Sequence, residues 1–485
     1  MAYKDLREFI AKLEQEGEVQ RIEDEVDWKL EVAAIIRRSH DLKAPAPFFQ
    51  KIKGYPPGYR IFGAPLGPSG KPGRYWARIA LTLGLRPDLS TAELIEEYVK
   101  LNKRRPIKPV MVSNAPCQEV VRTGPQADLL EFPAPLYHQH DGGRYIGTWH
   151  TVVSKDPDTG WVNWGVYRIQ VHDSHTLGFL FQVPTQHMLL HYEKYEARNQ
   201  PMPFAIAIGT EPVTPMLAGL RYPRGVCEAD FIGAFRGEPL ELVKCKTVDL
   251  DVPATSEIVI EGEMPPHERR KEGPFGEFTG YAVAEVAPRP IGRVKAITFR
   301  RDPILSVVCV GMPVHCVNVL AAIARSARIL DELRSRGVPV RMAYCLPESA
   351  QQIIAVSTKV PFANFAQHLA TIMWGGAGRS PYLVVVNDDI DVTDIGQVLW
   401  AIGTRCNPAK GVFTMPNLPG YSLAPYLSSE ERELGLGGAA TLFDCTWPTT
   451  WPKEDIPVVA SFEAMCSPEL REKVVKNWAR YGYKE

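Results

Sequence analysis

The sequence predicts a multidomain α/β protein, because stretches of different character follow one another along its 485 residues. Helical periodicity dominates at the start, short strand-like apolar segments fill the middle, and helical periodicity returns towards the end. A chain of this length is too long for one hydrophobic core. We therefore predict an N-terminal α/β domain at 1–108, a β-rich domain at 109–304, a second α/β domain at 305–455 and a C-terminal helical segment at 456–485.

The N-terminal region carries helical apolar stripes. One stripe predicts an amphipathic helix over residues 3–16, ended by Gly17, and a further helix is expected near 91–102. The first stripe consists of Leu6, Phe9, Ile10 and Leu13. The stretch 102–109 is basic and interrupted by prolines, which places the first domain boundary there.

The middle of the chain is rich in Val, Ile and aromatic residues in short segments that Gly and Pro separate. These segments lie at 148–153, 162–171, 204–208, 257–261 and 294–299. Their composition is typical of β-strands. Because few helical stretches intervene, we predict a barrel-like sheet.

In the third region, helix and strand patterns alternate. Apolar stripes predict helices over 319–330 and 395–402, and the continuous apolar run at 383–386 predicts a buried strand. This alternation favours an α/β domain with a partly parallel sheet. The last segment, 468–483, is predicted to be a helix that reaches across to something else.

Composition and charge exclude several classes of function. Lys and Arg number 55 against 56 Asp and Glu, so nothing suggests nucleic acid or an anionic membrane as a partner. Residues 1–10 lack the apolar core of a signal peptide, and no uninterrupted apolar run approaches about 18 residues. The nine cysteines include no Cys-x-x-Cys pair, which indicates reduced thiols and a cytoplasmic location.

The loop Glu272-Gly-Pro-Phe-Gly-Glu277 is the most suggestive local motif. Its glycines and proline can shape a turn that aims both carboxylates at one spot, beside the apolar Phe275. Two crowded, partly desolvated acids titrate apart, so one can hold a proton near neutral pH and act as a donor. The common alternative for such a motif is a solvated acidic turn.

A second set of polar residues suggests a metal site in the middle region. Asn163, His187 and Glu228 offer amide oxygen, imidazole and carboxylate, a set that suits Mn²⁺ or Mg²⁺ holding a phosphate better than structural zinc. Taken singly, a histidine such as His187 is more often a hydrogen-bonded core residue, and an asparagine such as Asn163 is more often part of a turn or a helix cap. Strict strand alternation would place Asn163 and Arg168 on opposite faces, although Gly165 could host a bulge.

These residues, in this order and at these separations, resemble the UbiD-type decarboxylases, which use prenylated FMN. The motifs are Asn163-x4-Arg168, Gln186-His187, Glu228 and Glu272-Gly-Pro-Phe-Gly-Glu277. The segments 238–262 and 385–405 and the opening Asp-Leu-Arg-Glu-Phe look like the same family, so the resemblance covers essentially the whole chain. It implies a flavin-reductase-like split barrel between two α/β domains, and a terminal helix that supports a homodimer or a higher oligomer.

The resemblance also implies roles for individual residues. Asn163, His187 and Glu228 match positions that hold Mn²⁺, or Mg²⁺, against the cofactor phosphate, and K⁺ is a further candidate ion. The positions that line the flavin are matched by Val166, Tyr167, Arg168, Gln186 and His187. A catalytic Arg-Glu-Glu network is matched by Arg168, Glu272 and Glu277.

One position departs from the family pattern. The family often has a phosphate-contacting lysine just before the apolar strand that precedes its Asp-rich turn. Here Pro381 and Tyr382 occupy that point, with Arg379 slightly upstream. Either Arg379 takes the role, which we favour, or the phosphate rests on the metal and the backbone.

The implied reaction is reversible, non-oxidative decarboxylation of an aromatic acid. The substrate ring would join covalently to the prenylated flavin, CO2 would leave, and Glu277 would donate the replacing proton. His315 and Asn318 fall where the family surrounds the ring, and they favour a furan- or pyrrole-carboxylate over a styrene-like acid. Hydroxybenzoates remain an alternative substrate class, and a helix-start role is the alternative for His315.

Two rival functions compete with decarboxylation. The barrel alone would suit a flavin reductase, which would bleach with NAD(P)H and would leave the acidic loop without a role. A non-catalytic carrier of modified flavin would release no CO2 from any aromatic acid. The decarboxylase would depend on a separate flavin prenyltransferase for its cofactor.

Overall fold

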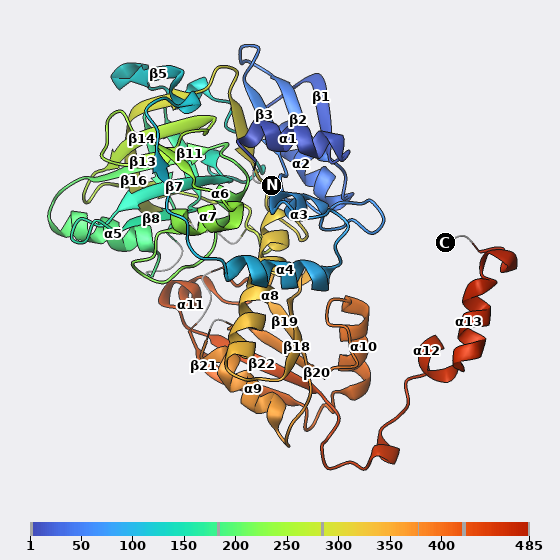
Figure 1. The fold of residues 1–485 in the computed structure, drawn as a ribbon. Coiled ribbons are helices and arrows are strands. Elements are labelled where there is room, and N and C mark those ends of the chain that lie inside the picture. The colour runs from blue at the N-terminus through green and yellow to red at the C-terminus, as the bar shows by residue number, and fades with distance from the viewer. Residues whose placement is uncertain (1–2, 182–184, 283–285, 377, 420–422, 484–485) are drawn as a thin grey trace.

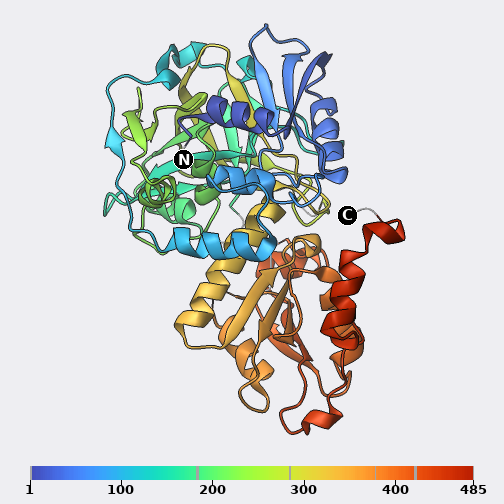
Figure 2. The ribbon, with the colours of Figure 1, turned by 45° about the vertical axis from the view of Figure 1, so that its right-hand side comes forward.

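A computed structural model describes residues 3–181, 185–282, 286–376, 378–419 and 423–483. It is a mixed α/β protein in which the strands of the described residues form four sheets. In Figure 1 the N-terminal region lies beside a curled, β-rich region, and the C-terminal α/β region lies below both. The same arrangement is visible from a second side in Figure 2.

The N-terminal sheet has four strands in the order β1-β2-β3-β17. Its strands are β1 (Val19–Val26), β2 (Ala46–Ile52), β3 (Arg60–Gly63) and β17 (Ile304–Val307). The helices of this region are α1 (Leu6–Gln15), α2 (Glu31–Asp41), α3 (Ala77–Thr82) and α4 (Thr91–Asn102). The outer strand β17 pairs in parallel with β3, although it follows the whole β-rich region in the sequence.

Helix α1 confirms the first predicted helix. Its N-terminus is capped by the Asp5 side chain, which accepts a hydrogen bond from the Glu8 amide at 2.9 Å. The predicted apolar stripe is buried. Gly17 ends the helix with a φ of 66°, a left-handed conformation that glycine adopts without a Cβ clash.

The β-rich region is a ten-stranded sheet with the main order β6-β9-β10-β16-β14-β11-β7-β8. These strands are β6 (Arg144–Gly147), β7 (His150–Lys155), β8 (Val162–Gly165), β9 (Ile169–Asp173), β10 (Thr176–Phe179), β11 (Met202–Ile208), β14 (Ile258–Met264) and β16 (Ala287–Phe299). The long β16 also pairs with β5 (Val120–Thr123) and β15 (Arg269–Glu272). The helices of this region are α5 (His187–Ala197), α6 (Val213–Ala218) and α7 (Glu228–Arg236). A small sheet combines β4 (Val110–Met111), β12 (Glu241–Lys244) and β13 (Asp251–Pro253).

A short connection shows how strongly the large sheet curls. Strand β8 lies at one end of the sheet and β9 next to the other end, yet only residues 166–168 join Gly165 to Ile169. Four Cα–Cα steps reach at most about 15 Å. The two ends of the sheet must therefore come close together, which gives the half-barrel seen in Figure 1 and confirms the predicted barrel-like sheet.

The C-terminal region contains a five-stranded sheet in the order β18-β19-β20-β22-β21. Its strands are β18 (Val340–Cys345), β19 (Ile353–Thr358), β20 (Tyr382–Asn387), β21 (Val412–Leu418) and β22 (Gly438–Cys445). Its helices are α8 (Cys316–Ser335), α9 (Phe365–Trp374), α10 (Ile395–Arg405) and α11 (Ser429–Leu434). The β19–β20 and β20–β22 pairs are parallel and the outer pairs antiparallel, so the predicted partly parallel sheet is confirmed.

Beyond β22 the chain leaves the body as an arm. It ends in α12 (Phe462–Met465) and α13 (Pro468–Lys476), which stand apart from the rest of the molecule in Figure 1. Every residue of these two helices, all of which the structure describes, is at least partly exposed. Helix α13 ends at Lys476 and is shorter than the helix expected over 468–483. Within the described part of the chain, none of the helices has the length and apolar character needed to span a bilayer.

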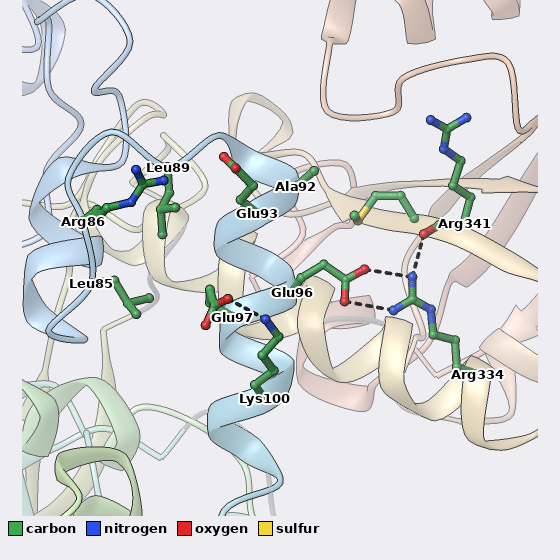
Figure 3. A pocket seen from close by; sticks show the side chains of 11 residues that line it. Leu85, Arg86, Leu89, Ala92, Glu93, Glu96, Glu97, Lys100, Arg334 and Arg341 are labelled. Atoms are coloured by element: carbon green, nitrogen blue, oxygen red, sulfur yellow. Dashed lines mark hydrogen bonds and ion pairs between the residues drawn. The ribbon is translucent and has the colours of Figure 1, made fainter.

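A cavity of about 680 Å³ opens where α4 meets α8 and β18 (Figure 3). Glu96 of α4 bridges to Arg334 of α8 through two hydrogen bonds of 2.9 and 3.0 Å. Arg334 also donates to the Arg341 carbonyl of β18 at 2.8 Å. This cluster ties the N-terminal region to the C-terminal one. The described lining of the cavity does not include Arg168 or the two loop glutamates.

Candidate active site

The acidic loop begins where strand β15 ends. Strand β15 pairs with β16 up to the Glu272–Ala287 pair, so the ladder fixes the position of Glu272. The chain then turns at Gly273, which has a φ of 87°. A residue with a Cβ would be strained there. The turn brings Glu277 back beside Glu272.

Arg168 bridges the two loop carboxylates. Its Nε lies 2.9 Å from Glu272 Oε1 and its second terminal nitrogen 2.5 Å from Glu272 Oε2, a bidentate pair. The remaining terminal nitrogen donates to Glu277 Oε1. The family resemblance implied a network of Arg168, Glu272 and Glu277, and in the structure both glutamates share the Arg168 guanidinium. The three residues assigned to catalysis by resemblance therefore lie together.

This cluster is almost inaccessible to water. The side chains of Arg168, Glu272 and Glu277 are 8%, 1% and 6% exposed. Burial raises the pKa of Glu277, and the neighbouring Glu272 carboxylate adds to this rise while Arg168 opposes it. The solvated acidic turn, which was the common alternative for this motif, is therefore excluded. A buried carboxyl with a raised pKa has the property of a general acid.

Aromatic rings close the cluster on one side. The Arg168 guanidinium lies 4.9 Å from the centre of the Phe275 ring and 5.6 Å from that of Tyr145. Both separations are in the range of cation–π contacts. The Tyr145 hydroxyl donates to Glu272 Oε1 at 3.2 Å. Phe275 thus forms the apolar wall that the sequence suggested for this loop.

Two contributors to this site had no signal in the sequence. Tyr145 belongs to β6, and Gln170 of β9 accepts a hydrogen bond from the Gly273 amide at 3.2 Å. Each lies over a hundred positions from the loop along the chain. A contact of this kind depends on the curl of the sheet and leaves no local spacing pattern. Only alignment of related sequences could have pointed to these residues.

Arg168 and Asn163 do not share a strand, so the expected alternation of faces does not apply. Strand β8 ends at Gly165, and Arg168 lies in the connection just before β9. Asn163 is buried on β8, and its amide nitrogen lies 3.3 Å from the Tyr167 hydroxyl. The crossing between the sheet ends therefore separates the two side chains.

The three predicted metal ligands are linked through a short series of contacts. Glu228 Oε2 accepts from the Trp164 amide at 2.8 Å, next to Asn163. The Tyr167 hydroxyl, which Asn163 contacts, accepts from the Met188 amide at 3.2 Å. Met188 follows His187 at the start of α5. Helices α5 and α7 both contact β8, so the three predicted ligands come from one strand and two helices packed against it.

The donor set fits a divalent cation. Burial raises the pKa of Glu228 to about 7, and among its described contacts the carboxylate accepts a backbone amide without a cationic partner. A bound dication would supply the missing positive charge. Among the described residues, no group of three or more His, Cys, Asp or Glu could hold a metal ion, and the candidate set at this place combines His187 and Glu228 with the amide of Asn163.

The surroundings of His187 also fit an anion such as a phosphate. Burial lowers the pKa of His187, and the positive charges of Arg224 and Arg221 lower it further. Both arginines are exposed, and both escaped the sequence prediction. Two guanidinium groups beside a histidine suit the negative charge of a phosphate group.

Three other predicted cofactor contacts have different surroundings. Val166 is half-buried in the connection that leads to Arg168, and Gln186 is the residue before α5. Arg379 lies in the C-terminal region, where its guanidinium donates to the Pro419 carbonyl. The assignment of these residues to the cofactor stays a prediction.

His315 and Asn318 are buried at the N-terminus of α8. Asn318 Oδ1 accepts from the His315 amide at 3.1 Å, which caps the helix. His315 Nε2 lies 3.2 Å from the carbonyl of Phe278, next to Glu277. The helix-start role considered for His315 is therefore present, and the contact with Phe278 also joins α8 to the acidic loop. Contact of either residue with a substrate stays a prediction.

Three family models match successive parts of the chain. They describe the N-terminal domain, the Rift-related domain and the C-terminal domain of 3-octaprenyl-4-hydroxybenzoate carboxy-lyase, and they match residues 10–98, 108–313 and 318–445. Together the matched segments cover most of the chain.

Curated relatives match over nearly their full length. Pyrrole-2-carboxylic acid decarboxylase of Pseudomonas aeruginosa is 36% identical, with 99% of this chain and 98% of the relative covered. Ferulic acid decarboxylase 1 of Saccharomyces cerevisiae is 30% identical, with the same shares covered.

Solved structures show the same fold. The open form of vanillic acid decarboxylase from Sedimentibacter hydroxybenzoicus has a TM-score of 0.84 at 31% identity, with 99% of this chain and 100% of that chain covered. The UbiD-class enzyme HmfF of Pelotomaculum thermopropionicum, in complex with FMN, has a TM-score of 0.83 at 29% identity, with 98% and 100% covered. This chain therefore belongs to the UbiD family of carboxy-lyases.

Proposed function

We propose that this protein decarboxylates a heteroaromatic carboxylic acid, such as a pyrrole- or furan-carboxylate, with prenylated FMN as cofactor. The observation that carries the proposal is the buried cluster in which Arg168 bridges Glu272 and Glu277. A flavin reductase or a flavin carrier would have no use for a buried acid with a raised pKa at this place. The relative that acts on pyrrole-2-carboxylate supports the heteroaromatic class.

Each side chain of the cluster has a separate role in the proposed reaction. Prenylated FMN, when bound, supplies the electron sink that loss of CO2 from an aromatic ring requires. Glu277 donates the proton that replaces CO2, because burial keeps this carboxyl protonated to higher pH than an ordinary glutamate. Arg168 orients the substrate carboxylate, and its bidentate contact with Glu272 fixes the guanidinium plane.

Asn163, His187 and Glu228 hold Mn²⁺, or Mg²⁺, against the cofactor phosphate in this proposal, with K⁺ as a further ion near the same phosphate. The buried carboxylate of Glu228 supports it. Glu228→Ala should lose metal and flavin together, measured by elemental analysis and by the flavin spectrum of the folded variant. A folded, metal-free variant with a full complement of flavin would refute the ligand assignment.

His315 and Asn318 are proposed to select the ring. Both are fully buried, and Asn318 Nδ2 has no hydrogen-bond partner among the described residues. Buried polar groups of this kind discriminate strongly between analogues that can and cannot pair with them. Asn318→Ala should therefore shift preference among pyrrole-, furan- and hydroxybenzoate-type acids, in competition assays with an unchanged flavin spectrum. Unaltered preference in both Asn318→Ala and His315→Ala would place the ring elsewhere.

The decisive experiment produces the protein together with a flavin prenyltransferase. Mass spectrometry identifies the bound flavin, and CO2 release is then measured on the three classes of acid. We expect release from a heteroaromatic acid and solvent-deuterium exchange at its ring position. Bleaching by NAD(P)H without CO2 release would favour the reductase, and a modified flavin with neither reaction would favour the carrier.

The arm supports a homodimer or higher homo-oligomer, with α13 as a contact. Its large apolar side chains are exposed in the single chain; they include Met465, Leu470, Val475 and Trp478. Such a surface is typical of a protein interface. The double variant Leu470→Glu and Val475→Glu should lower the mass measured by light scattering, whereas Leu42→Glu, at another exposed leucine, should not. An unchanged mass in the double variant would exclude this contact.

A further inference from the structure

The segment 138–142 contacts the acidic loop directly. Asp141 Oδ1 accepts a hydrogen bond from the Gly276 amide at 3.0 Å, and the Gly142 amide donates to the Pro274 carbonyl at 2.8 Å. Gly276 immediately precedes Glu277. The loop that carries Glu277 is therefore anchored to this segment through its backbone, and the Asp141 side chain that anchors it is only 1% exposed.

His138 sits between hydrogen-bond acceptors on both sides of its ring. Nδ1 lies 3.1 Å from Asp141 Oδ2, and Nε2 lies 3.1 Å from the carbonyl oxygen of Val310. The Asp141 carboxylate already accepts the amides of Gly276 and His138, so both of its oxygens act as acceptors. A ring with an acceptor at each nitrogen must donate from both. The geometry therefore describes an imidazolium ion paired with a carboxylate.

The charges around the ring agree with this description. Burial opposes the positive charge, but the hydrogen bonds to Asp141 and the Cys309 thiol outweigh burial and raise the pKa of His138 to about 10. Cys309 Sγ lies 4.0 Å from Nε2. Charged groups on neighbouring elements also face this pair: Glu277 interacts with Asp141, and Arg37 of α2 donates to the Met312 carbonyl and pairs with Asp41.

Close packing joins His138 to the loop as well. Its ring meets the Phe275 ring edge to face, with centroids 5.7 Å apart. A Cβ at Gly276 would lie 2.6 Å from His138 ring atoms, so the loop backbone rests directly on the imidazole. Movement of this ring would therefore move Phe275 and the backbone that carries Glu277.

We propose that His138 and Asp141 are positioning residues for Glu277: the doubly donating His138 ring holds the Asp141 carboxylate, and this carboxylate in turn accepts the Gly276 amide. The proposal rests on the proposed decarboxylase function for its catalytic consequence. His138 and Asp141 act through the loop and do not themselves supply the proton. Their structural consequence, a charged pair that holds the loop, can be tested without turnover.

The first test reads the charge directly. In protein labelled with ¹⁵N-histidine, the His138 signal is the one that disappears in His138→Gln. We expect this ring to remain doubly protonated at pH 8, well above the ordinary histidine pKa of about 6.5. In Asp141→Asn the ring should become neutral at pH 8, because the carboxylate that stabilises its charge is gone. A neutral His138 ring in the unmodified protein at pH 8 would overturn the proposal.

The second test reads the loop and the chemistry. Asp141→Ala removes the acceptor for the Gly276 amide, so hydrogen exchange in the peptide that contains the loop should accelerate. Turnover should fall about 100-fold with little change in KM, since small misplacement of a reacting group has effects of this size. The solvent-deuterium isotope effect on kcat should rise as proton delivery becomes slower.

Matched variants separate positioning from general damage. Asp141→Asn keeps an oxygen for the Gly276 amide, so it should lose less turnover than Asp141→Ala, and it carries the test if Asp141→Ala does not fold. Glu261→Gln makes the same carboxylate-to-amide change at a fully buried anchor for the Lys246 and Thr247 amides, and it should leave the isotope effect unchanged.

The outcomes for the two proposals are distinct. Unmodified turnover and loop exchange in Asp141→Ala would overturn the positioning role, whatever the substrate. Absence of decarboxylation by the cofactor-loaded wild type would refute the proposed function alone. The charge on His138 and the exchange of the loop peptide would still decide whether the pair anchors the loop.

Discussion

Two arginine–glutamate clusters in this protein have the same pairing chemistry and very different surroundings. Arg168 meets Glu272 through two hydrogen bonds, and Arg334 meets Glu96 through two hydrogen bonds. The side chains of the first pair are 8% and 1% exposed, and those of the second are 37% and 38% exposed. Among the ion pairs of the described residues, the first cluster includes a second carboxylate, that of Glu277, and the second cluster does not.

The comparison separates a structural ion pair from a reactive one. Water screens the exposed pair, so it contributes at most about 1 kcal/mol to stability. In the buried cluster the low local polarity strengthens every interaction, and one cation must serve two acids. The bidentate geometry alone therefore carries no information about function. Burial together with a surplus acid distinguishes the candidate active site.

The largest expected effect follows from Glu277→Gln. The amide keeps the size and the contact with Arg168 but cannot give up a proton, so turnover should fall by about two to four orders of magnitude. Flavin and metal contents should stay normal. The rate of CO2 release from the cofactor-loaded protein measures the loss. A near-normal rate here, with an inactive Glu272→Gln, would exchange the two roles.

Removal of the Arg168 guanidinium, which both carboxylates share, should lower the free energy of unfolding of the protein. Arg168→Ala leaves two buried carboxylates without their partner, and loss of one member of a buried pair costs about 3–5 kcal/mol. We expect a clearly lower urea midpoint than in the wild type. The matched variant Arg334→Ala should shift the midpoint far less. Equal shifts in the two variants would mean that burial does not distinguish the clusters.

The raised pKa of Glu277 should also appear in the pH dependence of stability. From the ordinary glutamate value of 4.5 up to the raised value, the folded chain binds a proton that the unfolded chain releases. The free energy of unfolding should therefore fall as pH rises through this window. Urea midpoints measured across the window should show a weaker fall in Glu277→Gln. Identical slopes in the two proteins would contradict the raised pKa.

The smallest effect is expected for the exposed pair. Glu96→Gln should leave turnover unchanged and lower stability by no more than about 1 kcal/mol. That difference should shrink further in 1 M salt, because salt screens exposed charges. A salt-independent loss of several kcal/mol would show that this pair behaves like the buried cluster.

Local patterns in the sequence predicted the parts of the fold that depend on nearby residues. The stripe from Leu6 to Leu13 and the glycine after it defined α1, because burial of one helix face and a left-handed end are both local properties. The acidic loop was likewise visible as a motif. The half-barrel followed from composition, although 162–171 proved to be two strands, β8 and β9, and not one.

Contacts that depend on the curl of the sheet could not be predicted. Gln170 and Tyr145 contact the acidic loop because the curl of the sheet brings strands β9 and β6 next to it. The sharing of Arg168 between both glutamates depends on a connection that crosses between the ends of the sheet. Spacing within one segment contains no trace of such contacts, because register and curl are set by the whole sheet.

The position of β17 late in the sequence has a consequence for how the N-terminal sheet forms during translation. Translation completes β1, β2 and β3 early, but the strand that covers the outer edge of β3 emerges only after the entire half-barrel. Until then β3 presents unpaired backbone groups, a template for pairing with other chains. A nascent chain released before Val307 would carry this open edge, so the N-terminal sheet reaches its final form only when the ribosome has passed that residue.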